Sequence, residues 1–87
     1  MKIVYHQTFL KHFKKRIAAN KRLEERFYQR LNLLIQNPSH PLLKRHQLLG
    51  TKSSHWSFSM TGDIRVIYRI EGNTLFLYDV GTHAQVY

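Results

Sequence analysis

Residues 62–70 alternate between apolar and polar side chains with the period of a β-strand. The apolar members are Ile64, Val66, Tyr68 and Ile70, and the residues between them are Asp63, Arg65, Ile67 and Arg69. Because neighbouring side chains of a strand point to opposite faces, the pattern predicts a strand with one buried face. Its other face carries Asp63 and Arg65 on a rigid support. We expect the rest of the chain to cover the apolar face or to bring polar groups to the charged one.

The segment before this strand predicts one further strand and two helices. Residues 2–5 are β-branched and aromatic, which is typical of a strand. Apolar residues then recur every four positions between cationic ones, which predicts an amphipathic helix over residues 7–19. A second helix is expected to begin after Asn20, a good N-cap residue, and to stop at Asn37-Pro38. The two helices should form a hairpin on one face of a sheet.

The segments on either side of residues 62–70 predict two more strands. Residues 38–54 contain both prolines and are expected to be a loop with little regular structure. Residues 55–60 alternate as a strand whose apolar side chains belong to the core, and a tight turn at 61–63 completes a hairpin. Residues 75–80 are the next strand. Gly81-Thr82 should break it, and residues 83–87 should form a short last strand or tail.

These elements predict one α+β domain spanning residues 1–87. An N-terminal strand and a helical hairpin precede a three- to four-stranded antiparallel sheet, whose second face stays partly open. A chain of 87 residues is long enough for one modest hydrophobic core and too short for two. It has no cysteine and no apolar run long enough to cross a membrane, so we expect a soluble, cytoplasmic protein.

The charge of the chain is strongly basic and unevenly distributed. Fourteen Lys and Arg residues against five Asp and Glu residues give a net charge of +9. Residues 1–52 hold twelve basic and two acidic side chains, a net +10, while residues 53–87 hold two and three, a net −1. Such a field favours a nucleic acid or an acidic protein as the partner.

Three motifs in this chain resemble those of a known protein family. They are Lys44–Gly50 (KRHQLLG), Gly62–Tyr68 (GDIRVIY) and Gly81–Tyr87 (GTHAQVY). With the predicted order of elements, they resemble the RelE/ParE superfamily of toxins from type II toxin–antitoxin systems, and within it the YafQ-like mRNA interferases. The resemblance implies a RelE-like microbial ribonuclease fold and a metal-independent endoribonuclease. It also implies that the enzyme cuts mRNA in the ribosomal A site to inhibit translation, needs no cofactor, and is silenced by a cognate acidic antitoxin.

The resemblance also implies positions for the site. His46, Asp63 and His83 fall where YafQ-like toxins keep catalytic residues, and Tyr87 falls where they keep a terminal aromatic residue. Arg65 falls where RelE-type toxins keep an arginine. The chain departs from the YafQ pattern at two further positions. Ser59 stands in place of a histidine, and Ile64 stands in place of a tryptophan.

These residue types suit RNA cleavage without a metal. The reaction needs a base for the 2′-OH proton, a cation for the phosphate and an acid for the leaving oxygen. We expect His83 to be the general acid and Arg65 to bind the phosphate. His46 would be a base whose neutral form is favoured by neighbouring cations. Asp63 would act in catalysis or orient a histidine, and Tyr87 would stack on a base or donate to the phosphate. Lys44, Arg45, Lys52 and Arg69 are expected to guide the RNA backbone.

Structural explanations exist for each of these residues, and two other functions stay open. The histidines could bind local backbone, Asp63 could cap its turn, Arg65 could form an ion pair, and Tyr87 could pack at the end of the sheet. One alternative function is a ParE-like toxin that binds DNA gyrase without being a nuclease. The other is a non-catalytic RNA- or ribosome-binding module. The six histidines lack an HxxxH spacing or clustered carboxylates, so no metal site is expected.

Overall fold

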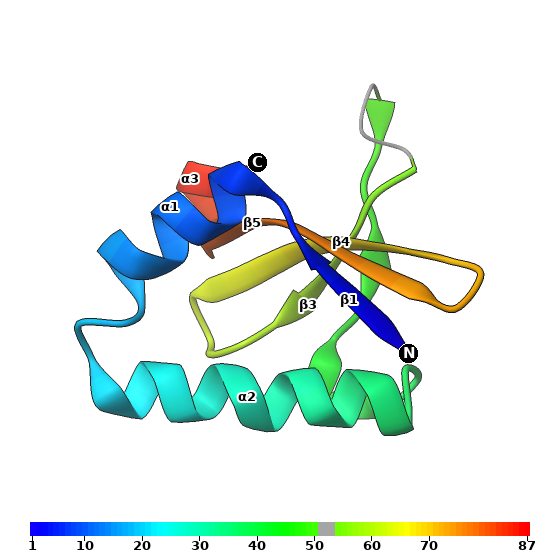
Figure 1. The fold of residues 1–87 in the computed structure, drawn as a ribbon, viewed down its shortest axis with the longest axis horizontal. Helices are drawn as coiled ribbons and strands as arrows, with labels where there is room; N and C mark the ends of the chain where they lie inside the picture. Colours follow the sequence, from blue (N-terminus) through cyan, green and yellow to red (C-terminus); the bar gives the residue numbers. More distant parts are fainter. Residues whose placement is uncertain (51–53) are drawn as a thin grey trace.

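The computed structural model describes residues 1–50 and 54–87, which form a twisted β-sheet flanked by helices (Figure 1). The helices are α1 (Gln7–Arg16), α2 (Lys21–Gln36), α3 (His83–Val86) and the short 3₁₀-helix η1 (Pro41–Leu43). The strands are β1 (Lys2–Tyr5), β2 (His46–Gln47), β3 (Trp56–Ser59), β4 (Ile64–Glu71) and β5 (Thr74–Thr82). The α2 helix runs along one side of the sheet, and α3 lies on the other side with the C-terminus.

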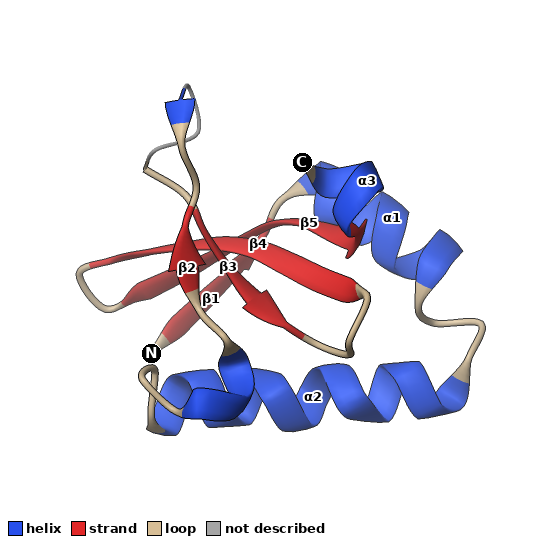
Figure 2. Ribbon diagram, turned by 180° about the vertical axis from the view of Figure 1, so that it is seen from behind, coloured by secondary structure: helices blue, strands red, loops and turns tan. Residues whose placement is uncertain are grey.

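The five strands form one sheet in the order β1-β5-β4-β3-β2 (Figure 2). Strands β2 to β5 pair antiparallel, and β1 joins the edge parallel to β5. The predicted α+β architecture is therefore confirmed, with β4 at the centre of the sheet. Asn20 caps α2 as predicted, because its side chain accepts hydrogen bonds from the backbone N–H groups of Arg22 and Leu23.

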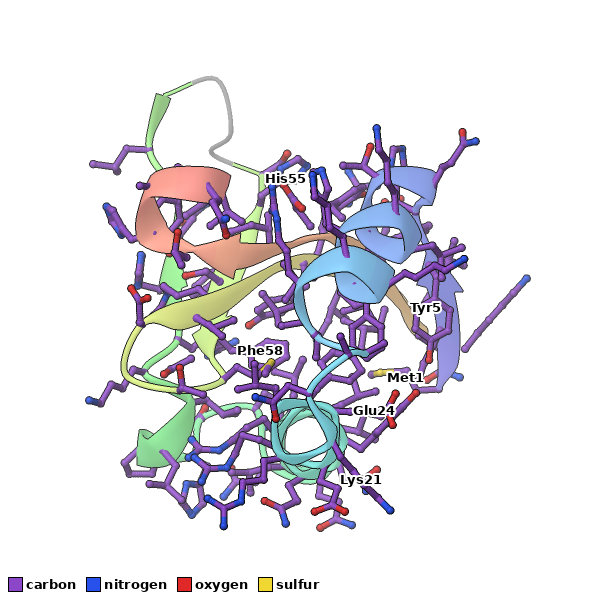
Figure 3. The ribbon with its side chains drawn as sticks, turned by 90° about the vertical axis from the view of Figure 1, so that its left-hand side faces the viewer. Met1, Tyr5, Lys21, Glu24, His55 and Phe58 are labelled. Atoms are coloured by element: carbon purple, nitrogen blue, oxygen red, sulfur yellow. The ribbon has the colours of Figure 1, made fainter. Side chains whose placement is uncertain are left out.

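The main hydrophobic core fills the space between the helices α1 and α2 and one face of the sheet. From β4 it takes Val66 and Tyr68, which are 0% and 1% exposed, so the predicted apolar face of this strand is the buried one. Figure 3 looks along α2 and shows the side chain of Phe58 from β3 between this helix and the sheet. The helices α1 and α2 contribute the buried residues Phe9, Phe27, Leu31 and Leu34, and Ile17, which follows α1, is buried with them.

A smaller cluster partly covers the second face of the sheet. Ile67 of β4 packs with Leu48 and Val86, and Tyr78 lies against them. Ile67, the apolar residue on the otherwise charged face of β4, thus holds α3 to the sheet. Because α3 packs on Ile67, its first residue His83 and the following residue Tyr87 are brought beside β4.

A β-bulge lies between β4 and β5. Ile67 pairs with Asp79 and Tyr68 pairs with Leu77, so Tyr78 is the extra residue of β5. A bulge re-aims the side chains of its strand. Tyr78 therefore joins the cluster under α3, while the Asp79 carboxylate contacts His12 Nδ1 of α1 at 2.6 Å.

The structure corrects four local predictions. Residues 83–86 form the helix α3 instead of a strand or tail, and β5 continues through Gly81-Thr82 instead of breaking there. The reason is that Gln85 Oε1 accepts a hydrogen bond from Thr82 N at 2.8 Å, which caps a helix directly at the end of the strand. The expected loop over residues 38–54 contains η1 and β2. Asp63 lies in the turn before β4 and not on the strand itself.

A search of the described residues for a helix that could span a lipid bilayer found none of the required length and apolarity.

Candidate active site

Side chains from β2, β3, β4 and the segment after α3 meet on the second face of the sheet, near the N-terminal end of β4. Strand β2 carries His46, which pairs directly with Ser57 of β3. Strand β4 carries Arg65, two residues from Ile67 and therefore on the same face. Tyr87 follows α3, and its side chain reaches back to β2 and β3. Residues 46, 57, 65 and 87, distant in sequence, thus form one hydrogen-bonded group.

Arg65 is held by three hydrogen-bond partners. Its Nε donates to Ser57 Oγ at 3.0 Å, and its Nη2 donates to the backbone oxygen of Lys44 at 2.8 Å. Nη2 also lies 3.3 Å from His46 Nδ1. Nη1 has no hydrogen-bond partner among the described residues. The guanidinium is therefore fixed along one edge while the Nη1 N–H groups stay available to bind a phosphate oxygen.

The turn at Lys44 is what offers its carbonyl oxygen to Arg65. Lys44 has a φ of 43°, which is the left-handed region and is uncommon for residues other than glycine. It ends η1 and leads into β2, so the same turn also places His46 beside Ser57. A backbone conformation that costs energy is found here next to the candidate site.

Tyr87 closes the group from the other side. Its hydroxyl donates to Ser57 Oγ at 2.5 Å and lies 3.2 Å from His46 Nε2. Ser57 Oγ itself is 3.5 Å from His46 Nε2, and Ser57 is fully buried. Ser57 is thus the common partner of Arg65, Tyr87 and, more distantly, His46.

His83 and His46 line the same pocket. The pocket has a volume of about 400 Å³ and is lined by His46, Gln47, Leu48, Leu49, His83 and Tyr87. The rings of His83 and Tyr87 pack edge to face, with centroids 4.2 Å apart. Within the described residues the His83 ring makes no hydrogen bond, so both of its nitrogen atoms are open to the pocket or to solvent.

Asp63 is not part of the hydrogen-bonded group. It is exposed, and its backbone N–H donates to Thr61 Oγ1 within the turn at 3.2 Å. The β4–β5 ladder ends at the pair Ile64–Thr82, and Asp63 and His83 lie just beyond this pair in the sequence. The Asp63 carboxylate makes no ion pair with any described residue.

The predicted RNA-guiding cations separate into different places. Lys44 is exposed beside Arg65. Arg45 lies over the ring of Trp56, with its guanidinium carbon 4.7 Å from the ring centroid. Arg69 forms an ion pair with Glu71 at 2.8 Å and lies over Phe76. Lys52 lies outside the described residues. Only Lys44 among the described three adjoins the site.

Ser57 is the residue of this site that the sequence did not indicate. The alternation of residues 55–60 identified Trp56 and Phe58 as core residues, which the structure confirms for Phe58, fully buried, and for Trp56, packed against the core. The same alternation places Ser57 and Ser59 together on the opposite face, and this was the available signal. Ser59, which stands where YafQ-like toxins have a histidine, donates to Thr61 O at 2.6 Å and so belongs to the turn.

Comparison with known proteins shows which family this chain resembles. Comparison with curated proteins found no match. Among solved structures, YafQ from Escherichia coli strain BL21(DE3) is 26% identical, with 99% of this chain and 97% of that chain covered and a TM-score of 0.82. The E. coli DinJ–YafQ toxin–antitoxin complex matches at 26% identity, with 99% and 96% of the two chains covered and a TM-score of 0.79.

A more distant structure extends the similarity of fold. The YoeB/ParE toxin from Agrobacterium tumefaciens is 22% identical, with coverage of 95% of this chain and 99% of that chain and a TM-score of 0.82. The family model described as "Bacterial toxin of type II toxin-antitoxin system, YafQ" matches residues 1–87. The β1-β5 parallel pair and the antiparallel sheet are the RelE-like fold of these relatives. The chain belongs to the YafQ family of type II toxin–antitoxin toxins.

Proposed function

We propose that this toxin is an endoribonuclease that cleaves mRNA in the ribosomal A site and thereby stops translation. The observation that supports this most strongly is the convergence of Arg65, His46 and Tyr87 beside the pocket that His83 lines. A cation with a free edge and two imidazoles are the groups that RNA cleavage requires. The 2′-OH of the RNA serves as the nucleophile, so DNA should resist.

Arg65 is proposed to bind the scissile phosphate through its Nη1 N–H groups. His83 is our candidate for the general acid, because its ring nitrogen atoms have no hydrogen bond in the described residues. His46 and Tyr87 would complete the proton transfer, with Tyr87 also offering its ring to a base. Asp63, in the turn before β4, would act only by orienting that histidine. These side chains supply every task, so the cleavage step itself is proposed to use no metal ion.

The partners of this toxin are proposed from its charge and its relatives. The E. coli relative was crystallised with the antitoxin DinJ. With a net charge of +9, this chain suits an acidic, partly disordered antitoxin that folds on binding. Lys11, Lys14 and Lys15 are exposed on α1 and suit phosphates of ribosomal RNA in the cytoplasm.

Expression of the wild-type chain, His83→Ala and Arg65→Ala in bacteria tests the proposal. We expect growth arrest and loss of a reporter mRNA with the wild type. Each variant should lower the cleavage rate of the purified protein about 10²- to 10⁴-fold, the usual cost of losing an acid–base group or its electrostatic partner. Growth arrest that persists in both variants, with the mRNA intact, would contradict a nuclease and point to gyrase or to simple binding.

A further inference from the structure

The protons of the site can be assigned from donor and acceptor chemistry alone. An arginine side chain has only donors, so the contact between Arg65 Nη2 and His46 Nδ1 at 3.3 Å requires a lone pair on Nδ1. Neutral His46 must then carry its proton on Nε2. That proton points at Tyr87 Oη, 3.2 Å away. The Tyr87 hydroxyl in turn donates its own proton to Ser57 Oγ.

Ser57 contacts the two residues at the ends of this chain of hydrogen bonds, Arg65 and Tyr87. Its Oγ accepts from Arg65 Nε at 3.0 Å and from the Tyr87 hydroxyl at 2.5 Å. It is buried on β3, directly opposite His46 in the register, so its position is set by the sheet and not by a mobile side chain. Without this oxygen, Arg65 loses one of its anchors and Tyr87 loses its acceptor.

We propose that Ser57 and Arg65 act as a positioning pair that holds neutral His46 in one tautomer, with the proton on Nε2 directed at Tyr87. Ser57 is the positioning residue in this pair, because it contacts the side chains of Arg65 and Tyr87 and is itself buried beneath them. The inference deepens the proposed nuclease function. In the free protein it makes His46 Nε2 a hydrogen-bond donor to Tyr87. The Tyr87 hydroxyl is then held by two partners, His46 and Ser57.

The chain offers a matched control for this inference. Ser59 is also buried, 6% exposed, and lies on the same face of β3 two residues from Ser57. Its hydroxyl donates only to the Thr61 backbone in the turn. Ser57→Ala and Ser59→Ala therefore each remove a buried hydroxyl from the same strand. Ser59 lies opposite Arg65 in the register, but only the Ser57 hydroxyl hydrogen-bonds to the side chains of the site.

The first measurement is ¹⁵N NMR of the histidine ring nitrogens in the free protein at a pH where His46 is neutral. We expect the wild type and Ser59→Ala to show His46 as the Nε2–H tautomer, and Ser57→Ala and Arg65→Ala to show a mixture of both tautomers. Wild-type His46 protonated on Nδ1 would overturn the proposal. A single unchanged tautomer in both Ser57→Ala and Arg65→Ala would overturn it as well. Because no RNA is present, this result does not depend on whether the protein is a nuclease.

The second measurement is cleavage of a reporter mRNA bound to purified ribosomes. Ser57→Ala should lower kcat about tenfold to a hundredfold with little change in KM, the cost of losing the hydrogen bonds that align reacting groups. Ser59→Ala should keep the wild-type kcat. Equal kcat values for the two variants would overturn the positioning role. Loss of activity in both, together with unfolding seen by circular dichroism, would also overturn it, because Ser57 would then be merely structural.

Discussion

The hydroxyl of Tyr87, the last residue of the chain, lies 2.5 Å from Ser57 Oγ, in the middle of β3. This contact ties the C-terminal helix to the strand hairpin across 30 residues of sequence. Its ring meanwhile packs edge to face against His83. Tyr87 therefore has two separable contributions, one from the hydroxyl and one from the ring.

Tyr87→Phe should separate these contributions. The ring contact with His83 is kept, but the bonds to Ser57 and His46 are lost. We expect the RNA cleavage rate to fall about tenfold to a hundredfold. Tyr87→Ala, which also removes the ring, should lower it further. A wild-type rate in Tyr87→Phe, measured on the same RNA, would show that only the ring matters.

Arg65→Lys should be strongly impaired although the charge is kept. A lysine ammonium cannot reproduce the planar fork that contacts Ser57, Lys44 and a phosphate together. We expect the cleavage rate to fall about 10²- to 10³-fold, as for the loss of one transition-state donor. The control is Arg30→Lys, because Arg30 also donates to a backbone oxygen, that of Leu42 at 2.7 Å, but on α2. Equal rates for the two variants would show that the fork of Arg65 is not needed.

Gly81→Ala should displace α3. A Cβ at position 81 would lie 2.6 Å from Gln85 Oε1, 2.7 Å from Arg16 Nη1 and 3.1 Å from Gln85 Cβ. The first two atoms form the cap of α3 and the bond from Arg16 to Val80 O, so they cannot move without losing these interactions. We expect a loss of about 1–3 kcal/mol in the free energy of unfolding, together with reduced cleavage.

The control for this change is Gly62→Ala. No atom lies within 4 Å of a Cβ built at Gly62. Its effect on the free energy of unfolding should stay within about 0.5 kcal/mol. Denaturant unfolding of both variants tests the comparison, and a Gly81→Ala protein as stable and active as Gly62→Ala would contradict it.

Tyr68→Phe should be tolerated in the core. The Tyr68 hydroxyl is buried and has no hydrogen-bond partner in the described residues, so its removal should leave the free energy of unfolding unchanged or raise it by up to about 1 kcal/mol at pH 7. Burial raises the pKa of Tyr68, and the nearby charge of Arg45 partly offsets the rise. The Tyr68 hydroxyl makes no hydrogen bond to Arg45, which acts on this pKa through its charge.

The sign of the pH effect follows from this raised pKa. Below about pH 10, Tyr68 is protonated in both the folded and the unfolded chain, and the stability is fully present. As the pH rises above that value, the unfolded chain ionises first and the free energy of unfolding falls. Chemical unfolding at pH 7 and pH 10.5 should show a smaller fall for Tyr68→Phe than for Tyr28→Phe, because Tyr28 lies on α2 and is 49% exposed. Equal falls would contradict the burial argument.

The sequence by itself determined the order of elements and the buried face of β4. Periodicity depends only on neighbours along the chain, so the alternation that placed Val66 and Tyr68 in the core could be read directly. The cap at Asn20 and the stop at Asn37-Pro38 were predictable for the same reason, because caps act within one helical turn. The motifs also indicated the family, and with it His46, Arg65, His83 and Tyr87 as candidates.

The tertiary structure alone decided how those candidates meet. The helix α3 depends on Gln85 reaching back to Thr82 and on Val86 packing against Ile67, and neither contact has a signal in the alternation of residues 83–87. The place of Ser57 among Arg65 and His46 depends on the register of β2, β3 and β4. Its contact with Tyr87 depends on where α3 ends, and the resulting group joins residues up to 41 positions apart in the chain. Asp63 and Arg65 looked like adjacent members of one strand face, but β4 begins only at Ile64, and Asp63 belongs to the turn before it. Local periodicity fixes which face a residue takes, and only long-range pairing fixes which residues share it.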